Sequence, residues 1–389
     1  MTAPAASVIE GGLWHRIMLL LRLEREPDPL APRRAAVMVG LTWLPLLVLT
    51  ALDGTASGGV AIPFLYDIAV HARCLIAIPV MILGEPILAG RLRPAVDQFR
   101  SAGLVGEDAA PVFDAALAEL RRRVQMPWPE LGLLVFALAM PWVLHTRIGL
   151  EVESSTWRAR AGAGGLSLTP AGEWLRLVSV PLSLFLALRW LWWLGLWSGF
   201  LRRVARSPLH VVPGHPDGHG GVGFLASAQT AWIPLVFALS VVLGGATGVR
   251  ILFGGHALPD YYPLLGSFVA FAVAIPLAPL IVFAPRLAVA KRRALFAYGR
   301  VASHTGRRFE EKWLGQAGTE SGALLEEGDV STLCDFGDVF ERVQKLSPIP
   351  IGRDGLVPLM AAALLPLLPL SLAVWPLDVI VKQLVGILF

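Results

Sequence analysis

Seven long apolar stretches constrain this chain more than any other feature. Each has enough residues, or nearly enough, to cross a hydrocarbon core of about 30 Å at 1.5 Å per helical residue. A mean hydropathy of +0.63 and 55% hydrophobic residues also exclude an ordinary soluble protein. The sequence therefore predicts an all-α, polytopic helical membrane protein with about seven transmembrane helices, embedded in the lipid bilayer. The stretches are 35–52, 68–90, 129–149, 177–201, 222–249, 263–285 and 356–375.

The loops between these stretches alternate between high and low Lys and Arg content, which predicts the orientation. Twenty-five of the 33 basic residues fall in four segments that share one side if the spans alternate. The positive-inside rule makes that side cytoplasmic. The N-terminus is then cytoplasmic and, with seven spans, the C-terminus lies outside. The four basic segments are the N-terminal one, 91–127, 202–221 and 286–355.

The segments outside the spans suggest four regions along the chain. Residues 12–25 have the pattern of an amphipathic helix on the membrane surface, 93–125 that of two short cytoplasmic helices, and Val330–Leu346 that of another helix. Cys74 and Cys334 fall in different compartments, so no disulfide is expected. The regions are 1–34 (cytoplasmic, with the amphipathic helix), 35–285 (six spans and the helices at 93–125), 286–355 (cytoplasmic helices) and 356–389 (seventh span and apolar tail).

The fourth stretch carries a charge, Arg189, midway along its length. A charge in that position costs about 2.5–3.5 kcal/mol on insertion scales, so a carboxylate partner is expected. Glu85 is one candidate, and the group of Asp67, His71 and Arg73 is the other. This intramembrane set is interpreted either as an ion, proton or anionic-substrate path, or as a buried ion pair that fixes helix register.

The most distinctive local sequence is the loop at 210–224, which follows the fourth stretch. Three interpretations remain open. His215, Asp217 and His219 offer N and O ligands for a divalent metal, although their spacing matches no standard signature. Gly220 and Gly221 offer backbone amides for an anion. The third interpretation is a structural turn in which Asp217 caps the next helix.

Glycines and prolines inside the spans suggest close packing and bends. Two Gly-x-x-x-Gly pairs permit helix contact, either within one chain or between subunits of a homo-oligomer. The sixth and seventh stretches each carry three prolines, which form either static kinks or hinges. The glycine pairs are Gly195/Gly199 and Gly244/Gly248.

Four segments together carry a family resemblance. They are IPFLYDIAVHAR (62–73) with the following Glu85, RWLWWLGLW…FLRRVARSPL (189–209), HPDGHGGVGFL (215–225) and DVSTLCDFGDVFERVQKLSPIPI running into ALLPLLPL (329–370). The chain resembles a family of uncharacterised bacterial multi-pass inner-membrane proteins with an HPD-x-x-GG-x-GFL cytoplasmic loop. In that family a basic residue often follows the Asp, whereas in this chain Gly218 follows it and His219 is an addition. The resemblance implies the architecture and an inner-membrane location, and no function.

Three function classes follow from these features. The leading hypothesis is a channel or transporter with a polar path near Arg189 and Glu85. The alternative is a non-transporting sensor or assembly protein that binds partners through its cytoplasmic helices and the HPD loop. An enzyme is the third, but no G-x-S-x-G or H-E-x-x-H motif is present. No cofactor is implied, and no nucleic-acid-binding module appears.

Overall fold

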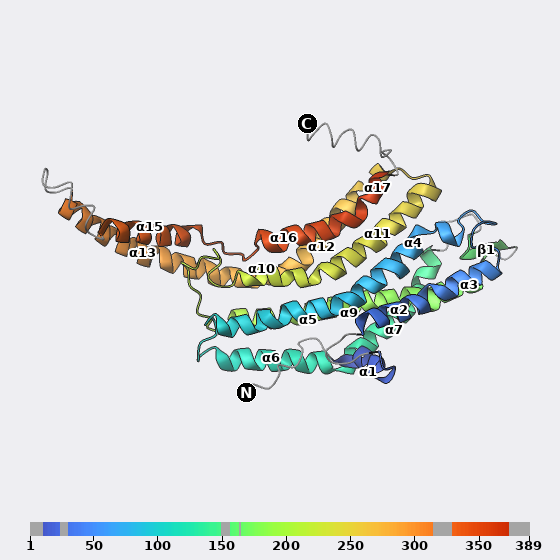
Figure 1. Ribbon diagram of the computed structural model, residues 1–389, viewed down its shortest axis with the longest axis horizontal. Helices are drawn as coiled ribbons and strands as arrows, with labels where there is room; N and C mark the ends of the chain where they lie inside the picture. The colour runs from blue at the N-terminus through green and yellow to red at the C-terminus, as the bar shows by residue number, and fades with distance from the viewer. Residues whose placement is uncertain (1–10, 24–29, 149–155, 163–164, 314–328, 373–389) are drawn as a thin grey trace.

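The computed structural model describes residues 11–23, 30–148, 156–162, 165–313 and 329–372, and these form an elongated helical bundle (Figure 1). Most helices run along its long axis. The α-helices are α1 Gly12–Leu20, α2 Ala31–Thr42, α3 Leu44–Leu52, α4 Ile68–His71, α5 Ile78–Ser101, α6 Ala110–Gln125, α7 Pro127–Ile148, α8 Pro170–Trp174, α9 Val180–Arg206, α10 Phe224–Ala228, α11 Ile233–Gly254, α12 Tyr262–Leu277, α13 Ala284–Trp313, α15 Asp329–Lys345, α16 Arg353–Leu364 and α17 Pro369–Leu372.

Consecutive helices join into segments that are long enough to cross a membrane. Six segments of the described chain qualify by length and hydropathy, and a seventh qualifies if α6 and α7 count as one span bent by 47°. The prediction of an all-α polytopic membrane protein is confirmed. The six are Ala31–Leu52, Ile68–Ser101, Pro170–Arg206, Phe224–Gly254, Leu258–Phe309 and Arg353–Ser371.

Short irregular turns join these helices. Two are π-helical, η2 (Ala72–Ala77) before α5 and η3 (Leu175–Ser179) before α9. The 3-10 turn η6 (Ala278–Phe283) joins α12 to α13, where Pro279 stands near its start. The other 3-10 turns are η1 Phe64–Tyr66, η4 Gln229–Trp232, η5 Leu258–Tyr261 and η7 Leu365–Leu367.

A small sheet that the sequence did not predict lies at one end of the bundle, the hairpin end. Strands β1 (Ala159–Gly162) and β2 (Gly165–Leu168) pair antiparallel, with Ala159 opposite Leu168. Trp157, just before β1, is fully buried and makes an edge-to-face contact with Phe64 at 5.2 Å. The hairpin thereby covers the ends of α3 and α4 (Figure 1).

The opposite end of the bundle, the basic end, holds α6, α13 and α15 (Figure 1). The first helix expected within 93–125 is the end of α5, which continues unbroken to Ser101. Helix α13 continues from the preceding span, and α15 lies beside it with Phe336 stacked on Tyr298. Residues 314–328 of the predicted cytoplasmic region and 373–389 of the predicted apolar tail lie outside the described residues.

Helix α1 is part of the bundle core. The sequence predicts a surface helix at this position, yet Trp14 and Met18 are 6% and 1% exposed, whereas Leu20 is 84% exposed. Trp14 packs against Phe185 of α9 at 5.6 Å between ring centroids. Trp14 and Met18 thus meet protein while Leu19 and Leu20 stay exposed, and this contact places the N-terminus of α1 beside a group of buried charges. Both cysteines, Cys74 and Cys334, are free.

Candidate functional site

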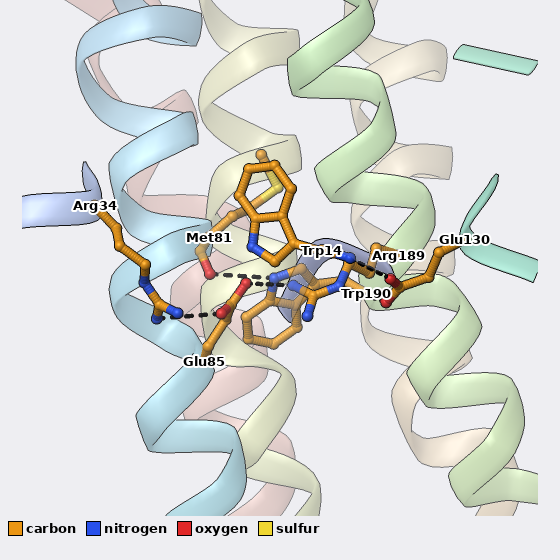
Figure 2. A network of polar contacts seen from close by, with 7 residues as sticks. All are labelled: Trp14, Arg34, Met81, Glu85, Glu130, Arg189 and Trp190. Atoms are coloured by element: carbon orange, nitrogen blue, oxygen red, sulfur yellow. Dashed lines mark hydrogen bonds and ion pairs between the residues drawn. The ribbon is translucent and has the colours of Figure 1, made fainter. Parts of the chain in front are cut away.

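Arg189 of α9 is the centre of a buried polar network (Figure 2). Its Nη1 donates to Glu85 Oε1 at 2.6 Å and its Nε donates to Glu130 Oε1 at 2.8 Å. Its Cζ lies 4.1 Å from the Trp193 ring centroid, a cation–π distance. Of the two candidate partners, Glu85 is the one that Arg189 contacts. Glu130 is a second partner that the sequence did not predict.

Arg34 of α2 balances the charge of this network. Its Nη2 lies 3.3 Å from Glu85 Oε2, so Glu85 bridges two guanidinium groups. The side chains of Arg34, Glu130 and Arg189 are 1%, 2% and 4% exposed, and that of Glu85 is 11% exposed. Among the described residues, the two carboxylates and two guanidinium groups of this network sum to zero. Balance matters because an unpaired buried charge costs several kcal/mol.

Glu130 also binds the N-terminus of α1. The Trp14 backbone N–H donates to Glu130 Oε2 at 2.8 Å (Figure 2). The first N–H groups of a helix lack intrahelical partners and favour a negative charge. Gly12 allows this approach, because a Cβ there would lie 2.6 Å from the carboxylate, and its φ of +86° also favours glycine. One carboxylate therefore holds α1 and α9 together.

The network occupies one level across four helices. Each of its charged residues lies 17 to 19 residues, or about 26–28 Å, from the hairpin-end terminus of its span, at Leu52, Ile68, Ile148 or Pro170. That length is close to the thickness of the hydrocarbon core. Arg34 and Glu130 are each the fourth residue of their helices. The network therefore lies at the first turns of α2 and α7 but partway along α5 and α9.

Asp67, His71 and Arg73 form a separate group near the hairpin end. Asp67 Oδ2 accepts from Trp157 Nε1 at 2.8 Å and pairs with Arg158, so it does not meet Arg189. His71 Nδ1 accepts from an indole N–H, which leaves Nε2 to donate to a carbonyl 3.2 Å away. This pattern is that of a neutral imidazole. Arg73 is half-buried within electrostatic range of Asp67. The structure places this group in the packing of the hairpin.

The HPD loop is organised around the Asp217 carboxylate. It accepts from the backbone N–H groups of His219, Gly221 and Gly223 at 2.8–3.1 Å, and the His215 ring lies 2.9 Å away. Burial raises the pKa of the carboxyl, but the three N–H donors and His215 lower it more, so the pKa lies below its ordinary value. Such a carboxylate holds a turn closed.

The same geometry bears on the other two interpretations of the loop. The N–H of Gly221 points at Asp217, so it is not available to an external anion. Gly220 has a φ of +69°, and a Cβ there would lie 2.4 Å from Val211. Among the described residues, no group of three or more His, Cys, Asp and Glu side chains is placed to hold a metal. The Ser347 N–H donates to the Gly218 carbonyl at 2.9 Å, which ties the loop to the segment after α15.

The fold and the network define a class: a polytopic α-helical membrane protein in which a buried ion-pair network joins α2, α5, α7 and α9. Comparison of the chain with protein-family models, curated proteins and solved structures finds no match. The family resemblance seen in the HPD loop therefore remains a prediction.

Proposed function

We propose that this chain is a bacterial inner-membrane protein with its N-terminus and its basic end in the cytoplasm. The positive-inside distribution supports this orientation, because the basic loops follow the ends of α5, α9 and η6 at one end of the bundle (Figure 1). The resemblance to bacterial inner-membrane proteins supports the location.

The two native cysteines provide a direct test of the orientation. Cys334 on α15 is exposed, whereas Cys74 is fully buried. In a Cys74→Ala variant, a membrane-impermeant maleimide is expected to label Cys334 in inside-out vesicles and not in intact cells. Labelling of intact cells would reverse the proposed orientation.

Within that membrane, the chain acts as a sensor or assembly protein rather than as a channel or transporter. The observation that carries this proposal is the enclosure of Arg189, whose guanidinium is bonded to two carboxylates and covered by Trp14 and Trp193. A charge that conducts ions or binds substrate must be reached by water or ligand, whereas the Arg189 side chain is only 4% exposed. The network then serves to fix the register of α2, α5, α7 and α9.

The working surface in this proposal is the pair α13 and α15. Both extend beyond the bundle at the basic end (Figure 1). On α13, Phe296 and Val301 are 78% and 50% exposed among charged neighbours. Exposed apolar side chains with a polar rim are typical of protein–protein contact sites.

A complementation experiment separates the surface from the network. In a deletion strain with a measurable phenotype, Arg189→Lys keeps the network charge and is expected to restore function if the protein folds. A chain lacking α15 (Asp329–Lys345) is expected to fail despite normal membrane insertion. Full rescue by the shortened chain, with loss in Arg189→Lys, would refute the proposal.

Transport is the second candidate, and the irregular helices favour it. The two π-helical turns η2 and η3 precede the helices that carry Glu85 and Arg189, and π-turns are frequent at functional sites. Flux of protons and small ions into liposomes tests this function directly. Transport predicts flux in the wild type that Glu85→Gln abolishes, whereas the sensor proposal predicts the same background leak in both.

A further inference from the structure

A cavity of about 800 Å³ lies at the basic end, between the end of α9 and the start of α13. Its lining includes four arginines, Arg202, Arg206, Arg286 and Arg293, together with His210. No carboxylate of the described residues lines it. Its volume is within the range of small-molecule sites.

The arginines reach the cavity because of helix periodicity. Arg202 and Arg206 are four residues apart on α9, and Arg286 and Arg293 are seven apart on α13, so each pair shares one helix face. Arg286 is held in place by donating to the Ser207 carbonyl oxygen. Within the part of the chain that the structure describes, Arg202, Arg206 and Arg293 have no carboxylate partner, so like charges meet across this cavity without compensation.

Topology alone does not account for this arrangement. The positive-inside rule and the dipole of α9 both favour basic residues near its C-terminus. Arg203 satisfies both preferences and Arg292 satisfies the positive-inside rule, yet neither lines the cavity. The convergence of two helix faces on one concave space is therefore an additional feature.

The remaining walls are apolar, and they include Leu209, Val289 and Pro285. Guanidinium groups pair with phosphate oxygens through parallel hydrogen bonds, and several of them balance more than one negative charge. We propose that this cavity binds a phosphoryl-bearing anion. An anionic lipid headgroup and a soluble organic phosphate share this chemistry.

Such a ligand would touch three elements at once, namely α9, α13 and the start of the HPD loop at His210 and Val211. That loop is bonded through Gly218 to Ser347, just after α15. Occupancy of the cavity would therefore fix the base of the α13 and α15 pair. This inference gives the proposed sensor a ligand class and rests on that proposal for its biological meaning. The binding itself is tested independently of it.

Matched charge variants provide the test. The pocket variant is Arg206→Gln with Arg293→Gln, and the control variant is Arg203→Gln with Arg292→Gln, which removes the same charge from the same two helices. For the soluble source, pyrophosphate is titrated by calorimetry into protein reconstituted in phosphatidylcholine nanodiscs. For the lipid source, phosphatidylglycerol retained on the detergent-purified protein is measured by native mass spectrometry against phosphatidylcholine.

We expect at least one probe to bind the wild type, with affinity weakened about tenfold or more in the pocket variant and less than about twofold in the control. Retention of phosphatidylglycerol alone identifies a headgroup site, and binding of pyrophosphate alone identifies a soluble ligand. Absence of binding by both probes, or equal weakening in the two variants, overturns the proposal. If the pocket variant fails to fold, Arg202→Gln is measured in the same way. None of these readouts depends on Cys334 labelling or on complementation.

Discussion

The buried network predicts a large, non-additive effect of charge removal. Glu130→Gln leaves two guanidinium groups facing one carboxylate, so the network changes from neutral to a net charge of +1. Removal of one member of a buried, hydrogen-bonded ion pair costs about 3–5 kcal/mol of the free energy of unfolding. Arg189→Met leaves the opposite imbalance and should cost a similar amount.

The double variant Glu130→Gln with Arg189→Met restores neutrality, because Glu85 and Arg34 remain paired at 3.3 Å. Its cost should be smaller than the sum of the two single costs by at least about 2 kcal/mol, since contacting charges are strongly coupled. The cycle is measured by reversible unfolding in mixed micelles, with tryptophan fluorescence as the readout.

Glu119→Gln is the matched control for this cycle. Glu119 also contacts two arginines, Arg122 and Arg123, but these arginine side chains are 65% and 47% exposed. Exposed ion pairs contribute little, so the stability of this variant should barely change. Single network variants as stable as this control, or strictly additive costs in the cycle, would show that the four charges are not energetically coupled.

Three further predictions concern local structure. Gly12→Ala should release α1 from Glu130, at a cost of about 1–3 kcal/mol, and should raise the rate of proteolysis within α1. Asp217→Asn should lower the melting temperature at pH 7. Because the folded pKa of Asp217 is depressed, its contribution is complete above about pH 4 and is lost as the pH falls through the folded value, so the melting temperatures should converge in acid. Asp67→Asn should free the β-hairpin, and collisional quenching of Trp157 fluorescence should then increase, whereas an unchanged quenching constant would contradict the assigned contact.

The spans and one of the ion pairs were predictable from local sequence. Long apolar runs identify membrane helices because each run is long enough to span the hydrocarbon core. Arg189 required a carboxylate, and helix length left Glu85 within reach. Both arguments depend on single helices and the distances along them.

The rest of the network depends on how the helices pack against one another. The residue periodicity of a single helix does not encode that packing. Arg34 and Glu130 occur in the first turns of their helices, where charged residues are common. The sequence therefore did not distinguish them from residues that set membrane orientation or cap a helix. The protein contacts of helix α1 were not predicted for a related reason. An amphipathic pattern is the same whether its apolar face meets lipid or protein.

The hairpin was missed because its strands lack the usual residues. Strand β1 reads ARAG and β2 reads GLSL, with no β-branched or aromatic residue in either. Its position is fixed from outside by Trp157 and Arg158 on Asp67. These contacts connect residues about 90 positions apart.

The order of synthesis gives the network a further consequence. Trp14 and Arg34 leave the ribosome early, but their carboxylate partners and Arg189 follow much later in the chain. At about 5–20 residues per second, the 175 residues from Trp14 to Arg189 take roughly 9–35 s to translate. During this interval the docking site of α1 is incomplete, because Glu130 and α9 are synthesised later than α1 and Arg34. The network closes only when α9 has been inserted at the correct depth, so its closure marks the completion of the first half of membrane assembly.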